Sequence, residues 1–134
     1  MIHCDIKPEN LLLDDNLDLK VCDFFGSSLH GSKALVCGAT RFRRPTLPRT
    51  PCDAQDDVFG LGSTIYMIAT STKPFEQSES DEVETRFLAA EFPDTEGLLF
   101  GEVMQACWRG SASIEEACGL IEANVQQMQK PDQP

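Results

Sequence analysis

The first ten residues carry side chains that can handle protons, phosphates and metal ions. The pattern H-x-D-x-K-x-x-N is formed by His3, Asp5, Lys7 and Asn10, and an apolar run follows directly. A carboxylate such as that of Asp5 can orient a hydroxyl group and accept its proton. The ammonium of Lys7 can neutralise negative charge that builds up on a phosphoryl group during transfer. These residue types at this spacing are therefore suited to phosphoryl transfer.

A carboxylate further along the chain could complete a metal site. Asp23 begins a D-F-F-G stretch thirteen residues after Asn10. The amide oxygen of Asn10 and the carboxylate of Asp23 are hard ligands of the kind that Mg²⁺ prefers. Each residue alone has an ordinary explanation, since an Asp-x-Lys pair is usually a surface ion pair worth under about 1 kcal/mol and Asp23 could belong to a turn. The ordered set as a whole favours the chemical explanation.

Asn10 and Asp23 can share an ion only if the chain between them turns back on itself. Residues 10–13 form an apolar run, an Asp-Asp-Asn triplet supplies turn residues, and residues 17–22 alternate between apolar and polar side chains. These signals are typical of two strands joined by a tight turn. The sequence therefore predicts a β-hairpin over residues 9–26, with both metal ligands at the same end.

A later stretch predicts a helix that belongs in the centre of the fold. It opens at Asp53 or Asp57 and covers residues 54–70, with apolar side chains at helical spacing and on nearly every face. Gly60 and Gly62 lie inside it, where each costs about 1 kcal/mol relative to alanine. We therefore expect neighbouring segments to pack closely against these two glycines.

The remaining stretches predict loops and three further helices. Residues 26–51 are rich in Gly, Ser and Pro, which predicts loops. Helices are predicted near residues 80–92 and 95–108, and a capping box that starts at Ser113 predicts a last helix. An apolar face of that last helix is formed by Ala117, Leu120, Ile121 and Met128.

In this order, the motifs resemble those of eukaryotic protein kinases. H-x-D-x-K-x-x-N resembles the catalytic loop, and D-F-F resembles the metal-binding D-F-G segment. The stretch G-A-T-R-F-R-R-P-T from Gly38 resembles the close of the activation segment, and D-V-F-G-L-G from Asp57 resembles the start of the long central helix. The pair Cys107-Trp108 is similar to one found late in the large lobe. The D-I-K-P-E-N and C-D-F-F-G-S-S-L strings resemble those of divergent fungal kinases.

The resemblance implies an α+β, mainly α-helical fold, namely the large C-terminal lobe of a protein kinase with a short β-hairpin. Residues 1–128 would form this partial kinase domain, and residues 129–134 a disordered tail. Within the domain the resemblance implies a catalytic loop at 3–10, a metal-binding hairpin at 11–26, an activation segment at 26–46 and a helical subdomain at 53–128.

The resemblance also implies a role for each candidate residue. Asp5 would be the catalytic base, and Lys7 would contact the phosphate of ATP. Asn10 and Asp23 would hold Mg²⁺, while His3 would have a structural role. A lysine at position 7 resembles serine/threonine kinases rather than tyrosine kinases, so the implied reaction transfers the γ-phosphate of ATP to Ser or Thr hydroxyls of a protein substrate.

Several residues depart from the kinase pattern. Cys4 stands where an arginine usually precedes the catalytic aspartate, so no adjacent guanidinium can pair with an activation-loop phosphate. Phe25 replaces the glycine of D-F-G. Thr46 replaces the glutamate of A-P-E, and Glu115 stands at the position of its usual arginine partner, so both halves of a buried ion pair are absent together.

Two alternative functions remain open. One is a pseudokinase or interaction module that retains the fold without catalysis, which Cys4, Phe25 and Thr46 favour. The other, which the K-P-E-N string disfavours, is a small-molecule phosphotransferase of the same architecture.

The sequence contains no glycine-rich loop and no strand lysine of the kind found in the kinase small lobe. We therefore expect the small lobe and the first large-lobe helices in a longer parent protein, ahead of Met1. The 134-residue chain alone is then expected to be inactive, because half of the ATP site is missing. One of the missing helices normally covers the central helix, so we expect residues 54–70 to expose an apolar face.

Composition limits the partners and the compartment. The net charge of −11 disfavours non-specific nucleic-acid binding. The six cysteines include no C-x-x-C pair and no zinc spacing, acidic residues near the start exclude a signal peptide, and no apolar run reaches the roughly 20 residues that cross a bilayer. These features predict reduced thiols, no membrane contact and an intracellular, cytoplasmic location.

Charge is unevenly distributed along the chain. The stretch from Glu76 to Glu102 is rich in carboxylates, with Arg86 as its single basic residue, and is typical of solvated helix faces. Between Lys33 and Arg49 lie four arginines without an acidic residue among them: Arg41, Arg43, Arg44 and Arg49. These arginines indicate either a surface for acidic substrates or a solvent-exposed loop without selectivity.

Overall fold

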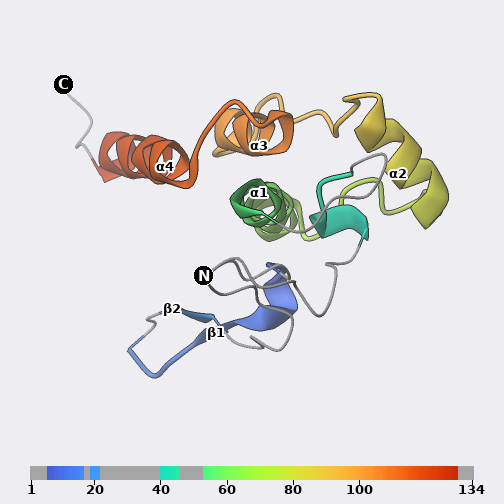
Figure 1. Cartoon of the computed structure of the whole chain (residues 1–134). Coiled ribbons are helices and arrows are strands. Elements are labelled where there is room, and N and C mark those ends of the chain that lie inside the picture. Colours follow the sequence, from blue (N-terminus) through green and yellow to red (C-terminus); the bar gives the residue numbers. More distant parts are fainter. Residues whose placement is uncertain (1–5, 17–18, 22–39, 46–52, 130–134) are drawn as a thin grey trace.

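The computed structural model describes residues 6–16, 19–21, 40–45 and 53–129. This part of the chain has an α+β, mainly α-helical fold, as predicted (Figure 1). None of its helices is both long enough and apolar enough to cross a lipid bilayer. The elements are η1 (Pro8–Asn10), β1 (Leu11–Leu13), β2 (Leu19–Val21), η3 (Thr40–Phe42), α1 (Ala54–Thr70), α2 (Ser80–Leu88), α3 (Gly101–Arg109) and α4 (Ile114–Gln129).

The predicted hairpin is present between β1 and β2. The two strands are antiparallel, and their register pairs Leu11 with Val21 and Leu13 with Leu19. The backbone N–H of Asn16 donates to Oδ1 of Asp14 at 2.9 Å, which stabilises the turn. The Asp-Asp-Asn triplet thus reverses the chain as its turn chemistry predicts.

Helix α1 covers the predicted residues 54–70, and of the two candidate start residues Asp53 is the one that caps it. Oδ1 of Asp53 accepts from the backbone N–H of Gln55 at 2.8 Å, and Oδ2 of Asp56 accepts from the backbone N–H of Asp53 at 2.7 Å. This reciprocal capping satisfies backbone donors that a helix start leaves unpaired. Figure 1 shows α1 between the hairpin on one side and α3 on the other.

The two glycines of α1 are sites of close approach, as expected. A Cβ atom on Gly60 would lie 2.7 Å from the carbonyl oxygen of Ile6 and 3.1 Å from that of Phe42. A Cβ atom on Gly62 would lie 2.8 Å from Cβ of Cys107. Gly60 thus admits the backbone of two other segments, and Gly62 lets α3 pack directly on α1.

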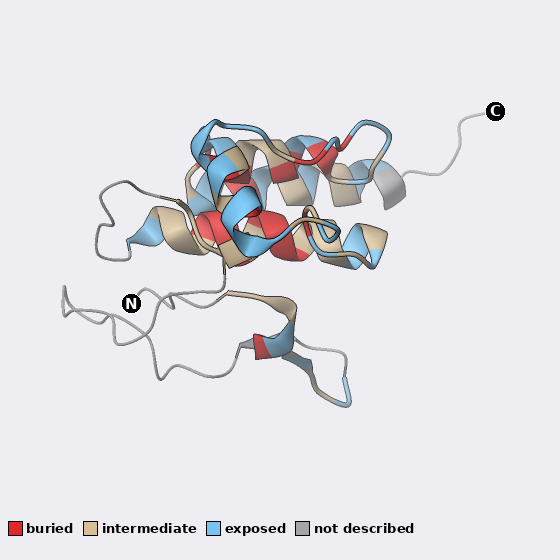
Figure 2. Ribbon diagram, turned by 90° about the vertical axis from the view of Figure 1, so that its right-hand side faces the viewer, coloured by how far each residue is buried: buried red, intermediate tan, exposed pale blue. Residues whose placement is uncertain are grey.

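Two groups of buried side chains hold α2, α3 and α4 against α1. The first is rich in aromatic rings: those of Phe59 and Phe87 meet edge to face at 5.2 Å, and those of Phe92 and Trp108 stack at 5.6 Å. Each such pair contributes about 0.5–1.5 kcal/mol beyond the area it buries. Figure 2 shows buried residues concentrated in the helices. The first group comprises Phe59, Val83, Phe87, Met104 and Trp108, and the second Val58, Val103, Cys107 and Ala117.

Helices α2 and α3 are shorter than predicted. Helix α2 ends at Leu88 rather than Phe92, because Ala90 adopts a left-handed backbone with φ 58° that turns the chain away. Helix α3 begins at Gly101 rather than Thr95, because Phe100 is also left-handed, with φ 63°.

Helix α4 begins with the predicted capping box. The backbone N–H of Glu116 donates to Oγ of Ser113 at 3.2 Å, and the backbone N–H of Ser113 donates to Oε1 of Glu116 at 3.3 Å. Of the predicted apolar face, Ala117 is fully buried, whereas Leu120 is 39% exposed. The face that packs is therefore narrower than the sequence pattern predicts.

Part of α1 carries an exposed apolar surface, as expected. The side chain of Ile68 is 71% exposed. It borders an apolar groove of about 440 Å³ that also involves residues 97–100 and Ile121 of α4.

Candidate functional site

The structure places Lys7 and Asn10 at the two ends of a single tight turn. Lys7 has an extended backbone, with φ −159° and ψ 162°, and Pro8 then starts the 3₁₀ turn η1. The backbone N–H of Asn10 donates to the carbonyl oxygen of Lys7 at 3.0 Å. Proline is suited to this place, because its fixed φ matches a helical start and it has no N–H to satisfy.

Asn10 is buried although it is polar, with only 5% of its surface exposed. It lies at the junction between η1 and β1, so its position is fixed by the turn on one side and by the strand pairing on the other. Lys7 is half-buried. The structure therefore places Lys7 and Asn10 in the same turn, directly before the first strand of the hairpin.

The segment that carries these residues rests on the central helix. The carbonyl oxygen of Ile6, next to Lys7, occupies the space that a side chain at position 60 would need. The carbonyl oxygen of Phe42 in η3 reaches the same point of α1. Ile6, at the start of the first segment, and Phe42 in η3 therefore both approach α1 at Gly60.

Two of the four predicted site residues lie outside the described residues. These are Asp5 and Asp23, and the same holds for Cys4, Phe25 and Thr46, at which the sequence departs from the kinase pattern. Val21, which pairs with Leu11, precedes Asp23 by two residues. Within the described part of the chain, no three His, Cys, Asp or Glu side chains gather into a possible metal site.

Arg41 makes contacts that sequence reasoning missed. Its Nε donates to the carbonyl oxygen of Pro74 at 2.9 Å, and its Nη2 donates to those of Phe75 at 3.2 Å and Ser78 at 2.5 Å. The backbone carbonyl of Arg41 in turn accepts from the hydroxyl of Ser63 at 2.6 Å. Only the uneven distribution of arginines in the sequence drew attention to this residue.

Arg44 is also engaged within the chain. Its Nη2 lies 3.0 Å from Oδ2 of Asp53 and its Nε lies 3.4 Å from Oδ1 of Asp56. Arg44 therefore ties the end of the 40–45 segment to the capping box of α1. For Arg41 and Arg44, these contacts favour a structural role over a surface for acidic substrates, while Arg49 lies outside the described residues.

The buried thiol of Cys107 is not suited to nucleophilic chemistry. Burial raises its pKa from 9.0 to about 11, with a smaller contribution from nearby Cys118. Because the thiolate is the reactive form of cysteine, Cys107 acts as a packing residue between α1 and α4.

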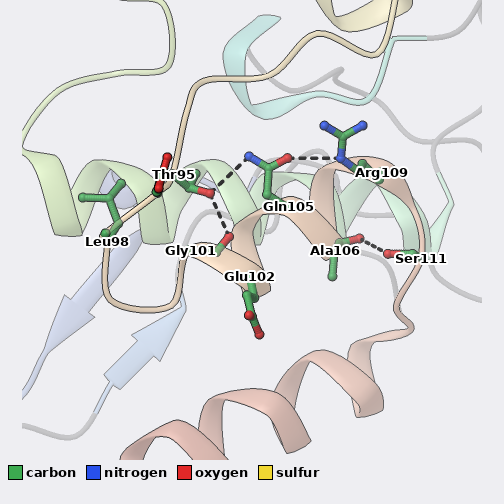
Figure 3. Close-up of a pocket in the computed structure, with 10 residues that line it drawn as sticks. Thr95, Leu98, Gly101, Glu102, Gln105, Ala106, Arg109 and Ser111 are labelled. Carbon is green, nitrogen blue, oxygen red and sulfur yellow. Dashed lines mark hydrogen bonds between the residues drawn. The ribbon is translucent and has the colours of Figure 1, made fainter.

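A hollow of about 600 Å³ lies beside α3, and several of the residues that line it hydrogen-bond to one another (Figure 3). Nε2 of Gln105 donates to Oγ1 of Thr95 at 3.2 Å, and Nε of Arg109 donates to Oε1 of Gln105 at 3.1 Å. The hydroxyl of Thr95 donates to the carbonyl oxygen of Gly101 at 3.2 Å. This network fixes the start of α3 and includes none of the predicted site residues.

Comparison with known proteins identifies relatives of this chain. The family described as protein kinase domain matches residues 1–123. The probable serine/threonine-protein kinase KIN1 homolog of Encephalitozoon cuniculi (strain GB-M1) is 31% identical over 97 residues, which cover 69% of this chain and 17% of that protein. The probable serine/threonine-protein kinase SIS8 of Arabidopsis thaliana is 26% identical over 140 residues, which cover 98% of this chain and 14% of that protein.

A third relative is named as a dual specificity kinase. The dual specificity mitogen-activated protein kinase kinase hemipterous of Drosophila melanogaster is 37% identical over 100 residues, which cover 69% of this chain and 8% of that protein. The chain thus spans less than a fifth of the length of each of these three relatives. Its match to the kinase domain nevertheless extends over nearly its whole length, and the turn between Lys7 and Asn10 lies inside that match. The chain belongs to the protein kinase family.

Proposed function

We propose that this chain forms the catalytic-loop side of a kinase large lobe, and that the protein containing it transfers the γ-phosphate of ATP to Ser or Thr hydroxyls of proteins. The observation that carries this proposal is the turn from Lys7 to Asn10, which leads directly into the paired strands. Family membership supports phosphoryl transfer as the reaction class.

Each site residue has a role in this proposal. Asp5 accepts the proton of the substrate hydroxyl. Lys7 neutralises charge on the transferred phosphoryl group. Asn10 and Asp23 hold Mg²⁺, which when bound neutralises the phosphate charge of ATP.

The chemistry of Asn10 fits a magnesium ligand. Its side chain is buried, directly before β1, and the carbonyl oxygen of an amide is a hard donor of the type that Mg²⁺ takes. The strand register supports the assignment of Asp23, because Val21 lies opposite Leu11, the residue after Asn10.

The preference for Ser and Thr rests on Lys7 and on the names of two relatives, which are serine/threonine kinases. The relative that is named as a dual specificity kinase represents the alternative, in which tyrosine is phosphorylated as well. Phosphoamino-acid analysis of a generic protein substrate would distinguish the two, and phosphotyrosine as the main product would contradict the preference.

A pseudokinase is the second candidate, and the observation that favours it is the set of substitutions at Cys4, Phe25 and Thr46. Asp5→Asn in the full-length protein separates the two functions. Loss of the base is expected to lower kcat by about 10²- to 10⁴-fold, measured with radiolabelled ATP and a generic substrate. Asp15→Asn is the matched control, because Asp15 is an exposed residue of the hairpin turn.

Unchanged turnover in Asp5→Asn would contradict the role of this carboxylate, and a wild-type protein without turnover would favour the pseudokinase. The 134-residue chain alone is expected not to bind ATP tightly, because it contains only one side of the site. Tight magnesium-dependent binding of ATP to the chain in calorimetry would contradict this expectation.

A further inference from the structure

We propose that Arg41 is a positioning residue, whose side chain holds residues 40–45 in the place where a protein substrate meets the catalytic loop. This inference rests on the proposed kinase function. It goes beyond that function because it names the side-chain contact that fixes the position of residues 40–45.

The partners of Arg41 form a carbonyl cluster, which we define as the carbonyl oxygens of Pro74, Phe75 and Ser78. The guanidinium donates to all three at 2.5–3.2 Å. These residues are 33, 34 and 37 positions away in the sequence, so one side chain joins two distant segments. Hydrogen bonds from a charged donor are about twice as strong as neutral ones.

The loop that provides the carbonyl cluster is itself well defined. The backbone N–H of Ser78 donates to the carbonyl oxygen of Phe75 at 2.9 Å, which closes a tight turn. Phe75 has a positive φ of 51°, which is unusual for a residue with a side chain. The guanidinium of Arg86 on α2 lies 4.7 Å from the centre of its ring. The loop therefore presents its carbonyl oxygens from a fixed backbone.

The backbone of Arg41 is held by a separate pair of hydrogen bonds, which involve α1 and α3. Nε1 of Trp108 donates to Oγ of Ser63 at 2.9 Å, and this hydroxyl donates to the carbonyl oxygen of Arg41 at 2.6 Å. Ser63 and Trp108 are both buried. The segment at Arg41 is thus fixed by its backbone to α1 and α3, and by its side chain to the loop after α1.

Residues 40–45, which Arg41 holds in place, border the predicted catalytic loop. Phe42 follows Arg41 in the sequence. The carbonyl oxygens of Phe42 and Ile6 both lie close to Gly60 of α1, at 3.1 Å and 2.7 Å from the place that a Cβ atom would occupy. Ile6 is next to Lys7 and belongs to the catalytic-loop motif. A protein substrate that brings a hydroxyl to this loop would therefore lie beside residues 40–45.

Arginine is needed for this contact because its planar group offers several donors in a fixed fork. Lysine keeps the charge but concentrates its donors at a single atom, so it can serve the carbonyl cluster only in part. Within the described residues, the partners of the Arg41 side chain are carbonyl oxygens rather than carboxylates. Loss of the side chain therefore removes a geometric constraint rather than an ion pair.

The test compares three variants of the full-length protein in steady-state kinetics with a protein substrate. Arg41→Met is expected to raise KM for the protein substrate about tenfold and to leave kcat within about twofold. Arg41→Lys should recover part of this loss. Lys73→Met is the matched control, because it removes a positive charge from an exposed position of the same loop, and it should leave both constants unchanged.

Hydrogen exchange gives a second measurement that does not depend on turnover. Peptides that cover residues 40–45 and 74–78 should exchange faster in Arg41→Met than in the wild type and in Lys73→Met, whereas peptides of α3 should not change. Unchanged exchange in both segments would overturn the proposal, as would an unchanged KM or an equal loss in kcat.

The two measurements also separate this proposal from the proposed function. A wild-type protein without any turnover overturns the kinase function and the role of Arg41 in substrate binding. Faster exchange in such a protein would still support the contact between the two segments.

Discussion

The hairpin region from Ile6 to Val21 carries Lys7 and Asn10, two of the four residues proposed for chemistry, whereas the helices from Ala54 to Gln129 carry most of the packing of the described residues. Among the residues of the hairpin region whose burial the structure describes, Asn10 is the one that is buried, and Leu12 is 56% exposed. Apart from Phe42, the buried apolar side chains of the described residues all belong to the sequence from Val58 onward. Figure 2 shows the same contrast.

This difference shows that the buried core and the described residues proposed for chemistry lie in separate parts of the chain. Burial of apolar side chains is the main favourable contribution to folding, so the helices should fold and unfold as a unit around α1. In the hairpin region, the side chains whose burial the structure describes are exposed or only partly buried, apart from Asn10, and this region approaches α1 through the carbonyl oxygen of Ile6 at Gly60. Substitutions in the two regions should therefore have different consequences.

The largest expected effect is on the helical side. Phe59→Ala removes a ring that is 1% exposed and that contacts two other aromatic rings, and should lower the free energy of unfolding by about 3–5 kcal/mol. Leu12→Ala, at an exposed position of the hairpin, should lower it by less than about 1 kcal/mol. Urea denaturation followed by circular dichroism measures both. Similar losses in the two variants would remove the proposed difference between the regions.

An intermediate effect is expected at Gly60, where the carbonyl oxygen of Ile6 in the hairpin region lies close to α1. Gly60→Ala places a methyl group 2.7 Å from the carbonyl oxygen of Ile6, and should destabilise the fold by about 1–3 kcal/mol. Hydrogen exchange should increase more around residues 6–10 than in α3. Gly119→Ala in α4 is the control, because no atom lies within 4 Å of the added carbon, and it should stabilise the helix by about 0.5–1 kcal/mol. If Gly60→Ala were as stable as the control, the close approach would not exist in solution.

The smallest expected effect is a pH dependence of the helical core. The pKa of Cys107 is raised to about 11 by burial and, to a lesser degree, by Cys118. Between pH 9 and 11 the unfolded chain therefore releases this proton more readily than the folded chain. Stability should fall as pH rises, by about 1 kcal/mol from pH 8 to pH 10.

Denaturation at both pH values measures this contribution, with Cys107→Ala as the reference. The variant should lose less stability between pH 8 and pH 10 than the wild type. An equal loss in both proteins would show that Cys107 does not contribute to the pH dependence.

Local signals in the sequence predicted the elements that depend on local chemistry. Helix α1 was predictable because Asp53 caps it and apolar side chains surround it, and the start of α4 was predictable from Ser113 and Glu116. The end of α2 and the start of α3 were not, because they depend on left-handed backbone at Ala90 and Phe100. Neither residue type favours that conformation, so the residue types did not mark these two helix boundaries.

For the candidate site, the described residues cover only Lys7 and Asn10 of the predicted set. Motif spacing predicted that Lys7 and Asn10 belong together, and the structure places them in one turn. The contact of Arg41 had no such signal, because its partners are backbone carbonyl oxygens. Every residue has a carbonyl group, so the sequence does not mark those that will receive a distant arginine.

Trp108 is the single tryptophan of the chain. Its indole stacks on Phe92 and donates to the hydroxyl that holds the backbone of Arg41. An intrinsic fluorophore is thus linked by two successive hydrogen bonds, through Ser63, to the segment proposed to receive substrate. Changes in its emission offer a label-free optical signal for following how that segment responds to a bound peptide.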